Sequence, residues 1–225
     1  LTNGKQYILL PEAKDYKRIG EGDQGLNTGG MGAVSPVPFV DDHMKQLVEE
    51  RIVKPTVAGL AAEEIDYQGF IFFCLFNVNG APYVIEYNCR MGDPETEVVF
   101  PRISSDVLEM MKACADHQLD QYQLQVNPQT AVTVMMVSGG YPGDYEKGKE
   151  INIEYQGDSM VFHAGTSMKE GKLVTSGGRV LAVTSFANSI EAAAVASYKA
   201  IDEIYFEGAY YRRDIGGDLI NTAAP

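Results

Sequence analysis

Apolar and polar positions recur with two different periods along the chain, and these periods predict its elements. Alternating or continuous apolar residues predict strands over 6–10, 69–78, 83–88, 131–137, 160–164, 173–176 and 179–184. Apolar residues at helical spacing predict helices over 41–64, 107–115 and 190–205. The part of the chain after residue 128 therefore has the pattern of a small α+β unit.

Turn residues connect some of the predicted strands into hairpins. The dipeptides Asn3-Gly4 and Asn79-Gly80 are typical of tight turns between antiparallel strands. The second dipeptide follows a continuous apolar run over 70–76, which predicts a central strand buried on both faces. The strand over 83–88 is then the second strand of that hairpin.

Capping and breaking residues set the expected limits of the helices. Pro55 should kink or divide the first helix, because proline lacks the N–H that a helix interior needs. Ser104 or Ser105 is expected to cap the second helix. Asn188 with Glu191 three residues later has the pattern of a capping box for the third helix.

The stretch 84–97 is the strongest candidate for chemistry. Strand alternation places Glu86 and Asn88 on one face, roughly 7 Å apart, with Arg90 continuing that face. A carboxylate and an amide oxygen so placed suit a hard cation such as Mg²⁺, which binds oxygen ligands and keeps positions open for phosphate. Alternating polar residues on a strand also occur where a face is simply solvated, so both interpretations stay open at this point.

A turn and a helix start are expected directly after this strand. Gly92 permits a tight turn, Asp93 is a candidate N-cap, and Pro94 fits the first helical position before Glu95. A helix N-terminus attracts anions, so the stretch combines metal ligands, a cation and an anion site, which suits phosphate chemistry. Ordinary capping explains an Asp-Pro pair equally well.

A glycine-rich stretch over 20–36 is the second candidate for ligand binding. Its six glycines allow close approach of backbone N–H groups to a phosphate or carboxylate. It matches neither a P-loop nor a dinucleotide fingerprint, because the glycine spacing differs and no Gly-Lys-Ser/Thr is present. A ligand cradle and a plain surface loop therefore remain equal alternatives.

Composition excludes some classes of function. The net charge of -13 argues against nucleic acid as a partner, because binding phosphate backbones requires a basic surface. No apolar run is long enough to span a membrane. Cys74, Cys89 and Cys114 lie far apart in apolar surroundings and are interpreted as buried free thiols of a cytoplasmic protein.

The domain organisation is predicted from a change in composition. Polar, Gln-rich residues at 120–128 indicate a boundary, which gives domains 1–120 and 121–225. The chain starts at Leu1 without an initiator Met and close to a strand, so it is interpreted as a piece of a longer polypeptide. A trimmed or processed N-terminus is the alternative.

Four segments resemble the phosphoribosylamine–glycine ligase family. They are 10–18, 27–36 (Asn-Thr-Gly-Gly-Met-Gly-Ala-Val-Ser-Pro), 86–95 (Glu-Tyr-Asn-Cys-Arg-Met-Gly-Asp-Pro-Glu) and 130–143. They occur in that family's order and span nearly the whole chain. Met91 departs from the family, which more often has Phe there, but both side chains are apolar.

The resemblance implies an α+β protein: the second part of an ATP-grasp domain, an antiparallel sheet with helices, followed by a small C-terminal α+β domain. It implies a ligase of purine biosynthesis that joins glycine to 5-phosphoribosylamine while ATP becomes ADP and phosphate. It also implies that the N-terminal part of the same polypeptide is missing, so this chain alone is expected to be inactive. Small molecules, and neither nucleic acid nor a membrane, are the expected partners.

The resemblance also assigns roles to individual positions. Glu86 and Asn88 match the residues that bind Mg²⁺ (or Mn²⁺) bridging the ATP phosphates, and Arg90 matches a catalytic residue that holds the glycine carboxylate or acyl phosphate. The expected substrate-binding residues are Asn27, Thr28, Gly29, Gly30, Gly32, Arg90, Gly92, Asp93 and Glu95.

Two other functions compete with this interpretation. Another ATP-grasp ligase or carboxylase could share the metal ligands, although the 90–95 motif disfavours it. A non-catalytic module with an acidic binding surface and a merely structural glycine loop is the other alternative.

Overall fold

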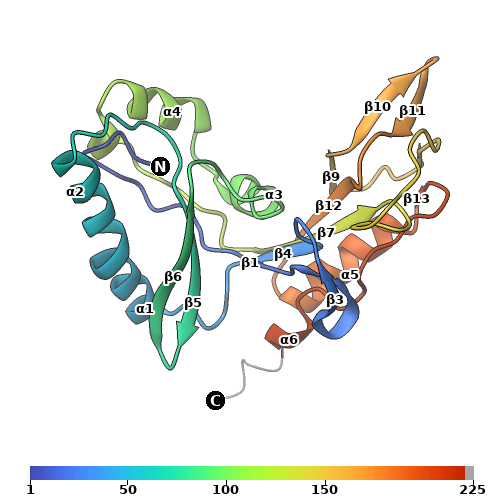
Figure 1. Ribbon diagram of the computed structural model, residues 1–225, viewed down its shortest axis with the longest axis horizontal. Helices are drawn as coiled ribbons and strands as arrows, with labels where there is room; N and C mark the ends of the chain where they lie inside the picture. The colour runs from blue at the N-terminus through green and yellow to red at the C-terminus, as the bar shows by residue number, and fades with distance from the viewer. Residues whose placement is uncertain (221–225) are drawn as a thin grey trace. The chain divides into compact units, whose positions relative to one another are not determined.

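The computed structural model describes residues 1–220 and contains two compact units (Figure 1). Unit 1 comprises Leu1–Glu12, Pro38–Gly92 and Pro101–Asn127, and unit 2 comprises Ala13–Val37, Asp93–Phe100 and the residues from Pro128 onward. Both are built from antiparallel strands and helices, which confirms the predicted α+β class. The predicted domain boundary at residue 120 stays a prediction, because each compact unit is assembled from several separate stretches of chain.

The first helix of unit 1 runs continuously past its proline. It consists of α1 (Asp42–Val48), a π-helical segment (Glu49–Val53) and α2 (Lys54–Ala62), and Asp41 caps its start by accepting from Met44 N. The wider π turn lies directly before Pro55, where a regular helix would place a carbonyl against the proline ring. The expected disturbance at Pro55 is thus a local change of helix type. The helix lies along the β5–β6 hairpin (Figure 1).

Strands β5 (Phe72–Val78) and β6 (Ala81–Asn88) form a two-stranded hairpin through the predicted Asn79-Gly80 turn. The prediction that the 70–76 run is buried on both faces is wrong: no residue of β5 is fully buried, and Phe76 is 64% exposed. The hairpin has only two strands among the described residues. The sequence of a strand shows how apolar the strand is, but it does not show whether other elements pack over it.

The remaining elements of unit 1 are short. Leu1 to Ile8 form a turn closed by an antiparallel bridge between Thr2 and Tyr7, so the predicted hairpin is reduced to that bridge and the predicted strand over 6–10 is wrong. Helix α4 (Val107–Ala115) is capped by Asp106, which accepts from Glu109 N at 3.0 Å, and not by either predicted serine. Ser105 Oγ instead accepts from Gln125 N and from the Tyr122 hydroxyl. A 3-10 turn follows at Leu119–Gln121.

Unit 2 is organised around a five-stranded antiparallel sheet with the order β1-β4-β7-β12-β9. The bounds are Lys14–Asp15 (β1), Gly32–Ser35 (β4), Thr130–Val137 (β7), Arg179–Ala187 (β12) and Met160–His163 (β9). The pairing of β4 with β7 brings the glycine-rich stretch into the sheet, although the two strands lie far apart in sequence. The predicted strands in this region are confirmed.

Helix α5 (Ile190–Ile201) covers one face of this sheet. The core between them is apolar, including Val132, Leu181 and Phe206, and Ser197 Oγ donates to the Val132 carbonyl. The predicted start of this helix at Ile190 is confirmed, but its predicted cap and its predicted end at Tyr205 are wrong. Ser189, and not Asn188, caps it, and the chain leaves the helix after Ile201 to form β13 (Ile204–Tyr205).

Short elements complete unit 2. They are β2 (Arg18–Gly20), a 3-10 turn (Glu21–Asp23), β3 (Gln24–Asn27), α3 (Thr96–Val99), β8 (Asn152–Ile153), β10 (Thr166–Lys169), β11 (Lys172–Thr175) and α6 (Gly217–Ile220); a 3-10 turn at Phe100–Arg102 follows α3. Buried Arg212 bonds the carboxylates of Asp23 and Asp214 and so fixes the β2–β3 hairpin. Within residues 1–220, no helix combines the length and apolar character needed to cross a membrane.

Candidate functional site

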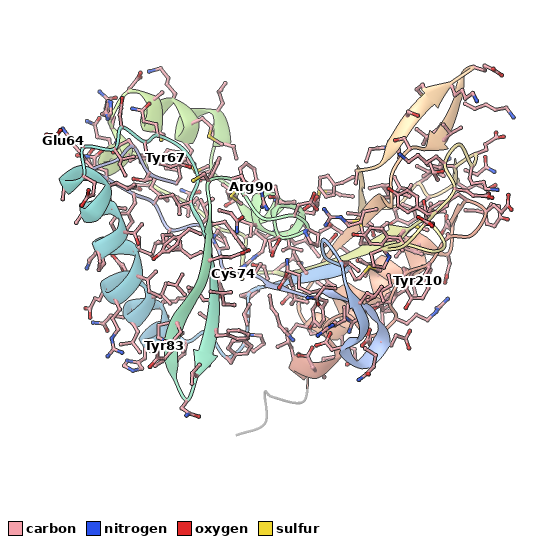
Figure 2. The ribbon with its side chains drawn as sticks, in the orientation of Figure 1. Glu64, Tyr67, Cys74, Tyr83, Arg90 and Tyr210 are labelled. Atoms are coloured by element: carbon pink, nitrogen blue, oxygen red, sulfur yellow. The ribbon has the colours of Figure 1, made fainter. Side chains whose placement is uncertain are left out.

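The end of strand β6 holds the predicted metal ligands together. Asn88 Nδ2 donates to Glu86 Oε1 at 3.1 Å, so the two side chains lie on the same face of the strand. Arg90 follows just beyond β6 (Figure 2), and its guanidinium donates to Met91 O at 2.9 Å and lies 3.5 Å from Asn88 Oδ1. Glu86 and Arg90 are exposed and Asn88 is half-buried, so ligands can reach all three.

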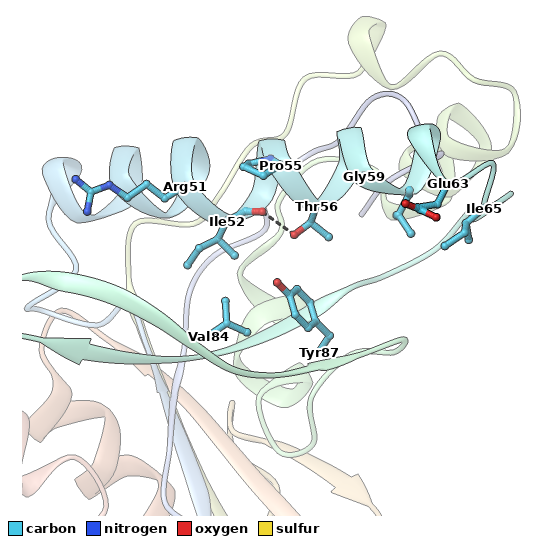
Figure 3. Close-up of a pocket in the computed structure, with 10 residues that line it drawn as sticks. Arg51, Ile52, Pro55, Thr56, Gly59, Glu63, Ile65, Val84 and Tyr87 are labelled. Atoms are coloured by element: carbon cyan, nitrogen blue, oxygen red, sulfur yellow. Dashed lines mark hydrogen bonds between the residues drawn. The ribbon is translucent and has the colours of Figure 1, made fainter.

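A β-bulge interrupts the alternation expected along this strand. The register passes from Cys74 opposite Glu86 to Leu75 opposite Val84, which leaves Ile85 as an extra residue on β6. Regular strand alternation would place residues 84 and 86 on the same face. Val84 instead lines a hollow beneath α2 together with Tyr87 (Figure 3), while Glu86 and Asn88 do not line it. The bulge thus separates the apolar packing face of β6 from its polar face.

None of the predicted site residues lines this hollow. Besides Val84 and Tyr87 it is lined by apolar residues such as Ile52 and Pro55, and by Arg51, Thr56 and Glu63. The hydroxyl of Thr56 is already used, because it donates to the Ile52 carbonyl at 2.6 Å (Figure 3). The candidate chemistry of unit 1 therefore lies on the opposite face of the hairpin.

The donor set at Glu86 and Asn88 fits a magnesium ion that is completed by substrate. Among residues 1–220, no group of three or more His, Cys, Asp and Glu side chains is arranged to hold a metal alone. Mg²⁺ in nucleotide-dependent enzymes is bound by one or two carboxylate or amide oxygens, and phosphate oxygens and waters fill its other positions. A carboxylate and an amide oxygen on an accessible strand end meet that requirement.

The glycine-rich loop of unit 2 is built by local hydrogen bonds. The Thr28 hydroxyl donates to Lys17 O at 2.8 Å and accepts from Gly30 N at 2.9 Å, which closes the loop over 27–30. Gly30 has φ +124°, and a Cβ there would lie 2.3 Å from Pro94 Cδ. Glycine is required at this position because the loop backbone packs directly on Pro94.

Arg179 connects this loop to the Asp93 turn. One of its terminal nitrogens donates to the carbonyls of Gly29 and Asp93 at 2.9 and 3.0 Å, and the other lies 3.0 Å from Asp93 Oδ2. Gly29 N also donates to the Tyr141 hydroxyl at 3.0 Å. Neither Arg179 nor Tyr141 was identified from the sequence, because no local pattern shows that β12 and the loop after β7 reach residues 29 and 93.

The segment after Asp93 differs from the prediction. Asp93 does not cap a helix and Pro94 is not a first helical residue; the helix α3 starts at Thr96 and has a single turn, with Glu95 before it. The Asp93 carboxylate is instead held by Arg179. Four residues align too few peptide dipoles to form an anion site, so the predicted helix N-terminus does not contribute one.

Acidic side chains are buried beside the glycine loop. Glu95 is 3% exposed, and its Oε1 lies 4.0 Å from Lys17 Nζ, which also forms an ion pair with Asp15. Burial, and then the charge of Asp15, raise the pKa of Glu95. Burial, and then the charge of Asp93, raise the pKa of Glu97 to about 7. Glu97 can thus hold or exchange a proton near neutral pH, and burial favours the protonated form of Glu95 as well.

The structure brings the predicted site residues together in two sets. Glu86, Asn88 and Arg90 lie at one strand end of unit 1, with Gly92 as the last residue of that segment. Residues 27–32, Asp93 and Glu95 lie together in unit 2.

Two family models match this chain. Residues 1–96 match the ATP-grasp (A) domain of phosphoribosylglycinamide synthetase, and residues 131–218 match its C domain. A phosphoribosylamine–glycine ligase of Chlorobaculum tepidum is 48% identical over 224 residues, which are 98% of this chain and 53% of that protein. The Synechocystis enzyme is 47% identical over 96% of this chain and 53% of its own length. The chain spans about half the length of these curated relatives.

Solved structures agree with the family models. The chain resembles phosphoribosylamine–glycine ligase from Thermotoga maritima with a TM-score of 0.83 and 36% identity, over 96% of this chain and 54% of that one. The biotin carboxylase domain of a Hydrogenobacter thermophilus 2-oxoglutarate carboxylase, solved with MgADP and bicarbonate, has a TM-score of 0.55 at 16% identity. It covers 80% of this chain and 40% of its own, and shows a shared fold only.

Proposed function

Since the chain belongs to the phosphoribosylamine–glycine ligase family, we propose that it supplies one half of an ATP-dependent ligase joining glycine to 5-phosphoribosylamine. The observation that carries this proposal is the polar end of β6, where Glu86, Asn88 and Arg90 gather in one accessible group. A reaction through an acyl phosphate requires oxygen ligands for a metal ion and, beside them, a permanently charged cation such as Arg90.

The chemistry explains why ATP is needed. The carboxylate oxygen of glycine is a poor leaving group, so the carboxylate must first be converted into glycyl phosphate. The amine of phosphoribosylamine then attacks the acyl carbon, and phosphate departs from the tetrahedral intermediate. Glu86 and Asn88 are the residues that would hold Mg²⁺, which when bound offsets negative charge on the ATP phosphates.

Arg90 is proposed to bind the glycine carboxylate or the acyl phosphate. Its planar guanidinium presents paired N–H donors that match two carboxylate or phosphate oxygens. In the structure these donors reach only the Met91 carbonyl and, more weakly, Asn88 Oδ1. An exposed cation with such modest partners can turn toward an anionic substrate at small cost.

The acceptor amine is proposed to bind beside the glycine loop. The proposed substrate-binding residues are Asn27, Thr28, Gly29, Gly30, Gly32, Gly92, Asp93 and Glu95. Arg179 supports this arrangement, because it binds Gly29 and Asp93 at the same time. Buried carboxyl groups with raised pKa values nearby suit a site that receives a proton when an amine becomes an amide.

The chain spans about half the length of its relatives, and this limits the activity that we propose for it alone. The relatives are about twice as long, so we propose that the remainder of the polypeptide completes the nucleotide site and that residues 1–225 alone do not turn over. A cytoplasmic location is kept as a prediction from the free thiols. Cys114 is buried, as predicted for all three thiols, but Cys74 is half-buried and Cys89 is exposed.

The deciding measurement is ADP release by the full-length protein with ATP, glycine and freshly made phosphoribosylamine, each omitted in turn. Release that needs both substrates supports the ligase. Glu86→Gln should abolish release without lowering the melting temperature, because the site is exposed and removing one charge there leaves packing unchanged. Wild-type turnover in this variant would exclude Glu86 from the site.

A different acceptor is the main alternative within the ATP-grasp fold, since biotin carboxylase domains share it. ADP release that depends on bicarbonate, or on an amine other than phosphoribosylamine, would identify it. If the protein is instead a non-catalytic module, ATP with Mg²⁺ should not raise the melting temperature of the full-length protein.

A further inference from the structure

The backbone donors of the glycine-rich loop are already used within unit 2. The N–H groups of residues 28–31 donate, in that order, to Lys17 O, the Tyr141 hydroxyl, the Thr28 hydroxyl and Tyr16 O, at 2.7 to 3.0 Å. An anion that binds beside this loop therefore needs donors from side chains.

Most basic side chains around the loop and the β2–β3 hairpin are neutralised by carboxylates. Their ion pairs are Lys17 with Asp15 and Glu95, Arg179 with Asp93, and Arg212 with Asp23 and Asp214. In a chain with a net charge of -13, a cation without such a partner is a distinctive feature.

Arg18 is such a cation. It is exposed at the start of β2, and one terminal nitrogen donates to Gly25 O at 2.9 Å. No carboxylate pairs with it in the part of the chain that the structure describes, so the other edge of its guanidinium is available. Asn27 lies directly opposite in β3 and is also exposed. Side chains of opposite residues share one face of a hairpin, with Cβ atoms about 4.5 to 5.5 Å apart.

The hairpin that carries this pair is held firmly. The buried Arg212 donates to Arg18 O at 3.1 Å and to Asp23 Oδ1 at 2.8 Å, and Gly22 N donates to Asp214 Oδ2 at 2.8 Å. These bonds fix the backbone on both sides of the 3-10 turn. A guanidinium placed in advance loses less entropy when it binds an anion.

We propose that Arg18, with the Asn27 carboxamide beside it, binds the phosphate group of the phosphoribosylamine acceptor. This assignment rests on the proposed function. A phosphate monoester carries a charge of about -1.5 to -2 near neutral pH, and its binding requires a cation that no carboxylate already neutralises. The free edge of the guanidinium matches two phosphate oxygens, and the amide group supplies a further donor.

Arg18→Gln in the full-length protein tests this assignment, because glutamine is polar and uncharged. We expect the KM for phosphoribosylamine to rise by about tenfold or more, while the KM values for ATP and glycine stay within about twofold. Arg18→Lys should keep part of the affinity, since an ammonium retains the charge without the paired donors. Arg213→Ala is the matched control and should change none of the three values, because this exposed arginine of unit 2 lies over the Tyr211 ring.

A binding measurement without turnover separates this proposal from the ligase activity. Titration calorimetry of the full-length protein uses ribose 5-phosphate as the probe and ribose as the reference without phosphate. The dissociation constant for ribose 5-phosphate should be weakened by about tenfold or more in Arg18→Gln. Added salt should weaken this binding more in the unchanged protein than in the variant, because salt screens the charge.

Three results would overturn the proposal. The first is equal behaviour of the unchanged protein and Arg18→Gln toward ribose 5-phosphate, including no binding by either. The second is an equal rise of the KM for ATP, because Arg18 would then bind a nucleotide phosphate. The third is an equal loss of affinity for ribose, which would mean that Arg18 shapes the sugar site. If ribose 5-phosphate binding depends on Arg18 but no substrate combination releases ADP, the phosphate site stands and the ligase proposal fails.

Discussion

Arg179 offers the sharpest test of how unit 2 holds its part of the site. Replacing it by alanine in the full-length protein removes the donors to the Gly29 and Asp93 carbonyls and the ion pair with the Asp93 carboxylate. The loop over 27–30 and the Asp93 turn then lose their shared partner.

The size of the effect follows from exposure. A hydrogen bond involving a charged group contributes about 1.5 to 3 kcal/mol. The Arg179 side chain is 19% exposed and that of Asp93 is 49% exposed, so water replaces much of the ion pair. We expect a total loss of about 2 kcal/mol. For a cooperative unit of about 150 to 250 residues, this lowers the melting temperature by about 4 to 8 °C.

The assay combines thermal unfolding with steady-state kinetics of the full-length protein. Arg213→Ala is the matched control, because this arginine of the same unit is exposed and its guanidinium lies over the Tyr211 ring. Arg179→Lys should give an intermediate loss, because one ammonium cannot serve both segments. In Arg179→Ala the KM for the amine acceptor should rise at least tenfold, while the KM for ATP stays within twofold.

Two results would refute this reasoning. A melting temperature of Arg179→Ala equal to that of Arg213→Ala would show that the contacts contribute no stability. An equal rise of the KM values for ATP and the acceptor would show that Arg179 supports the fold in general rather than the acceptor loop.

Three further variants test other parts of the site. Gly30→Ala should destabilise by about 2 kcal/mol or more, since its Cβ meets Pro94 at 2.3 Å, whereas Gly22→Ala, with positive φ but open space, should cost about 1 kcal/mol in denaturant unfolding. The raised pKa of Glu97 means that the folded state favours the protonated carboxyl group. The stability that this group contributes is fully present below pH 4.5 and is lost as the pH rises through about 7. Glu97→Gln should flatten this fall in melting temperature, and an unchanged profile would count against it. Arg90→Lys should raise the KM for glycine at least tenfold, because an ammonium binds one oxygen at a time; unaltered glycine dependence would remove Arg90 from that role.

Local signals in the sequence identified most of the elements. The β-branched run of β7 and the apolar stripe of α5 predicted the positions of these two elements, because the period of burial can be recognised from residues close together in the sequence. Caps were less well predicted. Asp106 and Ser189 each stand one residue from an equally suitable polar side chain, and tertiary packing decides between such neighbours.

Features that depend on distant contacts could not be predicted. The bulge at Ile85 arises from pairing with β5, so an isolated strand shows only alternation. The Asp93 carboxylate was expected to cap a helix, but Arg179, which is 86 residues away, binds it instead. The same reasoning explains the exposed β5, because an apolar sequence does not show whether another element packs over the strand.

The pairing of β4 with β7 also constrains the order in which the parts of the molecule can fold during synthesis. Unit 2 is assembled from three stretches of chain, and about a hundred residues separate the end of β4 at Ser35 from the start of β7 at Thr130. At translation rates of about 5 to 20 residues per second, a nascent β4 waits roughly 5 to 20 s on the ribosome for this neighbour. Unit 1 is meanwhile translated almost completely, so the glycine loop is among the last parts of the molecule to acquire its final shape.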